Sequence, residues 1–178
     1  GGRWVGLGGK TGKRCADVGD SGEEGRGANV PDTKEGWYYS TARPVVTENL
    51  IVIGGSVNDN GSTHGPSGVV RAYDVDTGEL VWNWDSGNPE QTAPIAGDDT
   101  YTASTPNSWS ISSVDEELGM VYVPMGNEVP DQWGENRNPA GTRFSSSVVA
   151  LDLKTGQVRR GFQTVHQDLV DMDASGRA

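Results

Sequence analysis

GVVRAYDVDTGELVWNW, residues 68–84, sets a pattern that the rest of the chain repeats. Its first half alternates between two faces and is rich in β-branched and aromatic residues, which predicts a strand. The triplet DTG at residues 76–78 then predicts a tight turn, because glycine adopts a positive φ without steric cost. The second half alternates again and places Leu80, Trp82 and Trp84 on one face. The stretch is therefore predicted to be a β-hairpin.

The hairpin recurs along the chain. Residues 148–158, VVALDLKTGQV, repeat the strand, the aspartate, the Thr-Gly turn and the outgoing strand. A weaker copy within residues 4–13 has Gly8 where the other two have the aspartate. Hairpins that recur at unequal spacing predict a radial β-repeat with long insertions, which is typical of propellers.

The repeat divides the chain into blades of four strands each. In the first complete blade, strands are expected at residues 42–46 and 49–53 before the hairpin, and in the next at 109–114 and 119–124. Residues 20–36 are polar, rich in glycine and aperiodic, which predicts a long surface connection. The predicted organisation is a partial blade (1–18), a linker (19–41), a blade (42–84), a blade (106–163) and a final loop (164–178).

The composition agrees with an all-β fold and narrows the function. With 33% hydrophobic residues and 26 glycines among 178 residues, the chain is typical of a loop-rich β protein. Its formal net charge of −11 argues against binding to nucleic acid or to an anionic membrane, since both need a basic face. A neutral substrate or a cation suits this charge better.

Few residues offer soft metal ligands or covalent cross-links. Cys15 is the only cysteine, and His64 and His166 are the only histidines. An intrachain disulfide and a zinc site of the usual Cys/His kind are therefore excluded. The sequence has no signal peptide and no apolar run long enough to span a bilayer. Because the chain begins and ends within its repeat pattern, we expect it to be a fragment of a longer protein.

One loop has the residue types of a cation site. Residues 54–67, GGSVNDNGSTHGPS, place Asp59 between Asn58 and Asn60. A solvated loop with an Asx turn explains this pattern, and so does a site for a hard cation, whose preferred ligands are carboxylate and amide oxygens. Trp109, at the predicted start of a strand, is by itself explained as an ordinary core aromatic.

The motifs taken together resemble one family. GGSVNDNGST, PSGVVRAYDVDTGELVW, TPNSW, VYVPMGN, PDQWGENR, SSVVALDLKTG and FQTVHQDLVDMD follow in this order. This succession closely resembles the quinoprotein dehydrogenases that depend on pyrroloquinoline quinone (PQQ), and within them the membrane-bound glucose, quinate and shikimate branch. The resemblance implies an eight-bladed β-propeller, of which this chain supplies about two and a half blades.

The resemblance also assigns residues to a site. Trp109 matches the tryptophan on whose face PQQ stacks. Asp59 and its neighbour Asn60 match the metal-binding loop, and Asn127 matches an amide ligand of the same cation, Ca²⁺ or Mg²⁺. Asp171 matches the catalytic aspartate.

The implied reaction is the oxidation of a sugar or cyclic polyol of the glucose, quinate or shikimate type. Asp171 removes the hydroxyl proton, the cation polarises the quinone, and the carbinol hydride moves to PQQ. The family then passes electrons to membrane ubiquinone, with the site at the periplasmic face of the bacterial inner membrane.

One position departs from the family motif, and one alternative function remains open. The family motif usually has tryptophan before the catalytic aspartate, where this chain has Val170. A propeller used as a scaffold for protein–protein contact, without cofactor, is the alternative function. The co-occurrence of Asp59, Trp109, Asn127 and Asp171 favours the dehydrogenase, because a scaffold has no need of them. We expect the isolated 178-residue chain to be inactive, because open sheet edges favour self-association over cofactor binding.

Overall fold

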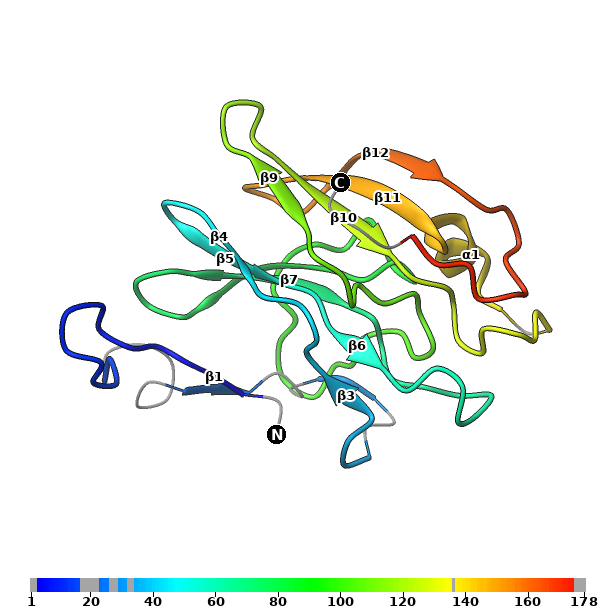
Figure 1. The fold of residues 1–178 in the computed structure, drawn as a ribbon, viewed down its shortest axis with the longest axis horizontal. Helices are drawn as coiled ribbons and strands as arrows, with labels where there is room; N and C mark the ends of the chain where they lie inside the picture. Colours follow the sequence, from blue (N-terminus) through cyan, green and yellow to red (C-terminus); the bar gives the residue numbers. More distant parts are fainter. Residues whose placement is uncertain (1–2, 17–22, 26–28, 32–33, 136, 175–178) are drawn as a thin grey trace.

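The structure, a computed structural model, describes residues 3–16, 23–25, 29–31, 34–135 and 137–174. Two four-stranded antiparallel sheets lie beside one another and form most of it (Figure 1). The first has the order β4 (Val45–Val46), β5 (Leu50–Ile53), β7 (Val70–Asp74) and β8 (Leu80–Trp84). The second has the order β12 (Val158–Gln163), β11 (Ser147–Asp152), β10 (Met120–Met125) and β9 (Ser113–Asp115).

Shorter elements complete the described part of the chain. β1 (Arg3–Val5) pairs with β2 (Glu23–Gly25), and β3 (Tyr38–Tyr39) pairs with β6 (Ser56–Val57). A single-turn helix, α1 (Pro139–Phe144), lies between β10 and β11. The side chain of Asn138 caps it by accepting a hydrogen bond from the amide of Ala140, and proline opens its first turn.

The main core lies between the two four-stranded sheets. Strand β7 contributes Val70 and Ala72, and β10 contributes Val121, Val123 and Met125, all buried in one cluster. The opposite face of β7 is buried too, because the Arg71 side chain lies between the rings of Tyr38 and Tyr101. Strand β7 is therefore covered on both faces, and its first four residues, Val70 to Tyr73, are all buried.

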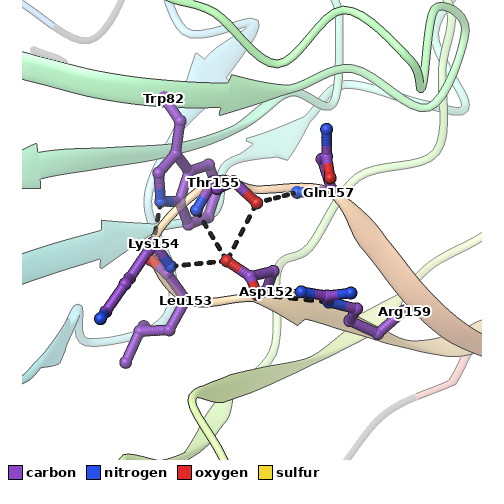
Figure 2. A network of polar contacts seen from close by, with 7 residues as sticks. All are labelled: Trp82, Asp152, Leu153, Lys154, Thr155, Gln157 and Arg159. Carbon is purple, nitrogen blue, oxygen red and sulfur yellow. Dashed lines mark hydrogen bonds and ion pairs between the residues drawn. The ribbon is translucent and has the colours of Figure 1, made fainter.

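The predicted hairpins have the same turn in both sheets. The carboxylate Oδ1 of Asp74 accepts hydrogen bonds from the amides of Asp76 and Thr77 and from the Thr77 hydroxyl. Asp152 does the same for Lys154 and Thr155 (Figure 2). The glycine after each threonine has a positive φ, 76° and 71° respectively, which closes the turn.

A tryptophan joins the two sheets. Trp82 Nε1 in β8 donates a hydrogen bond of 2.9 Å to the carbonyl of Leu153 in the turn of the other sheet (Figure 2). Gly156 lies against the same indole, and a Cβ on it would come within 2.6 Å of the ring. The turn of the second sheet is therefore also a contact between the two sheets.

The structure differs from the sequence prediction in three places. Residues 109–112 were expected in a strand but are irregular. The backbone there has other partners: the Gly126 amide donates to the carbonyl of Asn107, and the Thr41 hydroxyl donates to the carbonyl of Trp109. Residues 42–44, also expected in a strand, lie outside β4. The expected linker, 19–41, contains β2 and β3. Parts of the linker and of both chain ends lie outside the described residues.

Within the described residues, no helix has the length and apolar character needed to cross a bilayer.

Candidate functional site

Three loops carry four of the five predicted site residues, and the fifth, Trp109, lies between β8 and β9. Asp59 follows β6, the segment from Gly126 to Asp131 follows β10, and residues 164–174 follow β12 and return toward the end of β10 (Figure 1). The amide of Ala174 donates to the carbonyl of Met125, which fixes the returning segment beside β10. Loops from different strands therefore meet where those strands end.

Asp173 connects two of these segments to Trp109. The indole Nε1 of Trp109 donates a hydrogen bond of 2.8 Å to Asp173 Oδ2, and the backbone amide of Asn127 donates one of 2.6 Å to Oδ1. Gly126 allows this approach, because a Cβ there would lie 3.1 Å from Asp173 Oδ1 and 3.3 Å from the Trp109 ring. The half-buried indole is thus held at its nitrogen.

The electrostatics of Asp173 reflect this position. Burial raises the pKa of its carboxyl, and the negative charge of Asp171 adds to the rise, while the hydrogen bonds from Trp109 and Asn127 oppose it. The net shift is upward, so the surroundings favour the neutral form more than water does.

The Asn127 side chain is buried and fully hydrogen-bonded. Its amide nitrogen donates to the carbonyls of Asp131 and Asp168, and its oxygen accepts from the amide of Glu128 and the hydroxyl of Ser145. A carboxamide oxygen has two lone pairs, so a cation bound there would replace one of these donors. The rotatable Ser145 hydroxyl is the donor that can turn away.

Arg137 binds the same two backbone carbonyls. Its guanidinium donates to the carbonyls of Asp168, Pro130 and Asp131 at 2.6, 3.1 and 2.9 Å. Together with Asn127, it ties the loop after β10 to the segment after β12. The relative position of the two loops is therefore fixed by their backbones.

Asp131 is buried among like charges. Its side chain is 1% exposed, and neither carboxylate oxygen accepts a hydrogen bond in the described part of the chain. Burial first, and then the negative charges of Asp59, Asp171 and Asp173, raise the pKa of Asp131 to about 7, although the charge of Arg137 opposes the rise. The same three loops therefore contribute to one acidic cluster.

The remaining predicted residues lie around this cluster. Asp59 is half-buried, and burial raises its pKa, with the charges of Asp171 and Asp173 as further causes. Asn60 is exposed and donates to Asp59 Oδ1 at 3.4 Å. Asp171 is exposed and has a φ of 59°, in the left-handed region that side chains rarely adopt.

Two other buried carboxylates hold the loops in place by accepting hydrogen bonds from backbone amides and hydroxyls. Asp168, 1% exposed, accepts hydrogen bonds from the Ser146 hydroxyl and from the amides of Val170 and Met172. Glu128, also 1% exposed, accepts from the Asn138 amide and the Thr142 hydroxyl, and so anchors α1.

Of the predicted residues, the structure brings Asp59 and Asp171 within electrostatic reach of each other, and joins Trp109 and Asn127 through Asp173. The Asn60 side chain donates a hydrogen bond to Asp59. In the described residues it forms no hydrogen bond with any other predicted site residue. In those residues, no three His, Cys, Asp or Glu side chains lie close enough together to hold a metal ion by themselves. Sequence reasoning did not single out Asp131 and Asp173, although both stand in the motifs quoted for the resemblance.

Residues 1–178 match the family model described as glucose/ethanol/alcohol dehydrogenase, beta-propeller domain, of the PQQ proteins. The chain belongs to this PQQ dehydrogenase family. It is 44% identical over 172 residues to quinoprotein glucose dehydrogenase of Escherichia coli, covering 97% of this chain and 22% of that protein. It is 39% identical over 176 residues to the quinate/shikimate dehydrogenase (quinone) of Acinetobacter baylyi, covering 97% and 21%.

A solved structure of a quinohemoprotein dehydrogenase has the same fold. The quinohemoprotein alcohol dehydrogenase of Comamonas testosteroni superimposes with a TM-score of 0.72 and 25% identity, over 99% of this chain and 26% of that one. The β-propeller predicted from the hairpins is thereby confirmed. The chain spans about a quarter or less of the length of the relatives it matches.

Membership of the PQQ dehydrogenase family implies PQQ and a divalent cation, and two features of the site fit them. The Trp109 indole is half-buried and oriented by Asp173, which leaves a rigid aromatic surface for a planar molecule. The Asp131 carboxylate offers two buried oxygens without donors, which are ligands that a hard cation prefers.

Proposed function

We propose that this chain is the part of a PQQ-dependent dehydrogenase that carries its general base, one face of its cofactor site and ligands of its cation. The observation that carries the proposal is the bond from Trp109 Nε1 to Asp173. It ties the segment that contains Asp171 to the tryptophan that the family resemblance assigns to PQQ. A base and a redox cofactor act on one carbinol only if they are held together, and this bond supplies that link.

The residues have distinct roles in this proposal. Trp109 stacks on PQQ, Asp59 and Asn60 bind the cation, and Asn127 joins them through its amide oxygen. Asp171 accepts the proton of the substrate hydroxyl while the carbon that bears this hydroxyl loses a hydride, so that the alcohol becomes a carbonyl compound. When bound, PQQ supplies the two-electron acceptor, and the cation, Ca²⁺ or Mg²⁺, makes its carbonyl more electrophilic.

The exposed position of Asp171 supports its role as a base. Its neighbours Val170 and Met172 are exposed as well, with Val170 at 69%, so the side chain stands on an open surface that a substrate can approach. The Asp168 carboxylate accepts hydrogen bonds from the backbone amides of Val170 and Met172, which fixes the loop on both sides of Asp171.

For the substrate we propose a sugar or cyclic polyol, since the most similar proteins reported above are named for glucose and for quinate and shikimate. The word quinone in the name of the second supports membrane ubiquinone as the electron acceptor. We further propose the periplasmic face of the bacterial inner membrane as its location, on the same family resemblance.

The test is reconstitution of the full-length protein with PQQ and either Ca²⁺ or Mg²⁺. Dye reduction is then measured with glucose, quinate, shikimate and other polyols. We expect activity with at least one of them, and a loss of at least about 10²-fold in kcat for Asp171→Asn, the usual contribution of a general base. Asp76→Asn, which removes an exposed carboxylate from the hairpin turn, should leave kcat unchanged. Equal activity of the Asp171 variant and the wild type would refute the assignment.

A further inference from the structure

Asp131 is an anomaly among the buried carboxylates of the chain. Glu128 and Asp168 are as deeply buried, but their oxygens accept hydrogen bonds from amides and hydroxyls. Both oxygens of Asp131 lack any such donor in the part of the chain that the structure describes. Buried polar groups are nearly always hydrogen-bonded, because an unpaired one costs about 1–3 kcal/mol and a charged one more.

The surroundings of Asp131 add negative charge to this cost. The carboxylates of Asp59, Asp171 and Asp173 all act on it, and they come from the loops after β6 and β12. Like charges gathered in a poorly solvated place repel one another unless a counter-charge lies between them.

The positively charged side chain of Arg137 does not form an ion pair with the Asp131 carboxylate among the contacts that the structure shows in the described residues. Arg137 acts on Asp131 electrostatically, but its hydrogen bonds go to backbone carbonyls of Pro130, Asp131 and Asp168. These bonds, with that of Asn127 to the Asp131 carbonyl, hold the backbone so that the carboxylate stays buried. The backbone on which this carboxylate is carried is thus held in place by Arg137 and Asn127.

A proton alone would not satisfy the group. A protonated carboxyl needs an acceptor for its O–H, and its other oxygen still needs a donor. A divalent cation with oxygen ligands satisfies both oxygens and neutralises the neighbouring charges at once.

We propose that Asp131 is a ligand of the divalent cation, contributing a carboxylate from the loop between β10 and α1 in addition to that of Asp59. The proposal rests on the function proposed above and extends its cation site by one residue. Because the carboxylates do not gather closely enough to hold a metal by themselves in the described residues, amide oxygens complete the coordination. Asn127 then has a second role, since its side-chain nitrogen positions the Asp131 backbone.

The test is calorimetric titration of Ca²⁺ and of Mg²⁺ into the full-length protein, with and without PQQ, for the wild type and two variants. Asp131→Asn keeps the shape of the side chain and removes its charge. Glu128→Gln is the matched control, since it neutralises an equally buried carboxylate three residues away whose oxygens are already hydrogen-bonded. We expect at least a tenfold loss of cation affinity for Asp131→Asn and less than a threefold change for Glu128→Gln.

Thermal unfolding of the cation-free protein gives a second readout with opposite signs. Asp131→Asn should raise Tm, because it removes a buried charge among like charges, and should reduce the further rise that Ca²⁺ produces. Glu128→Gln should lower Tm, because it disturbs satisfied hydrogen bonds, and should leave the rise with Ca²⁺ intact.

The outcomes separate this proposal from the proposed function. If the wild type oxidises a polyol with PQQ but Asp131→Asn binds both cations as the wild type does, the ligand assignment is wrong and the function stands. If binding depends on Asp131 but no polyol is oxidised, the function is wrong and the assignment stands. A wild type that binds neither cation in either condition overturns the assignment as well.

Discussion

Trp109 and Asp173, 64 residues apart in the sequence, are joined by a hydrogen bond of 2.8 Å from the indole Nε1 to Oδ2. The other oxygen of this carboxylate, Oδ1, accepts a hydrogen bond from the backbone amide of Asn127. Asp173 therefore orients the aromatic ring proposed to stack on PQQ and fixes the loop after β10. The sequence prediction gave Asp173 no role, but in the structure it positions Trp109 and Asn127, which were both predicted site residues.

The first prediction concerns this bond. Asp173→Asn presents one oxygen and one NH₂ group to two donors, so one hydrogen bond is lost and a donor is left unpaired. We expect PQQ affinity of the full-length protein to fall by about 1–3 kcal/mol, roughly 5- to 150-fold. Trp109→Phe removes the donor and keeps an aromatic face, so its loss should be smaller. Equilibrium dialysis with PQQ measures both, and an unchanged affinity in Asp173→Asn would contradict the positioning role.

The second prediction concerns the contact between blades. Gly156 has a φ of 71°, and a Cβ there would lie 2.6 Å from the Trp82 ring, whereas Gly119 has a φ of 64° with open space around it. Gly119→Ala should cost only the left-handed strain, about 1–2 kcal/mol of unfolding free energy. Gly156→Ala should cost about 2–5 kcal/mol, because overpacking adds to the strain. Denaturant unfolding compares them, and equal costs would show that the indole moves aside freely.

The third prediction concerns pH and the turn of Figure 2. Burial raises the pKa of Asp152, but hydrogen bonds from Arg159, Thr155 and the Lys154 amide outweigh it, so the pKa is lowered. A carboxyl whose pKa is depressed by folding stabilises the protein above its unfolded pKa of about 3.9, and this contribution disappears as the pH falls through the folded value. Asp152→Asn should therefore be less stable than the wild type at pH 7, by about 1 kcal/mol for the weakened hydrogen bonds.

The difference should shrink in acid, and the two proteins should have similar unfolding free energies once the carboxyl is protonated. Asp76→Asn in the other hairpin serves as the control, since the turn bonds there go to Asp74. A difference between Asp152→Asn and the wild type that is constant from pH 7 to acid would rule out the charge as its cause.

Local patterns were enough to predict the hairpins, because the amides and hydroxyls that donate to Oδ1 of Asp74 and of Asp152 lie only two or three residues further along the chain. The start of the second blade was mispredicted for the opposite reason. Residues 109–112 have a strand-like sequence, but the backbone around them pairs with Gly126 and Thr41, which no local pattern reveals.

The candidate site shows the same division. The resemblance supplied Asp59, Trp109 and Asp171 by motif. The distinctive feature of Asp131 is that burial leaves its carboxylate without donors, and burial follows only from the packing of three loops. Sequence alone gives an aspartate between Pro130 and Gln132, which is indistinguishable from a surface turn.

The last prediction concerns Arg137, which binds three backbone carbonyls across two loops. Arg137→Lys replaces a planar group with several donors by a single ammonium, which cannot reach all three carbonyls, so the loops after β10 and β12 should lose their fixed position. We expect Tm to fall and the affinities for Ca²⁺ and PQQ to fall together in the full-length protein. Arg159→Lys is the matched control, since the arginine it replaces is 57% exposed in an ion pair with Asp152, and exposed pairs contribute about 0–1 kcal/mol. A Tm loss in Arg137→Lys with both affinities unchanged would mean that the clamp stabilises the fold without shaping the site.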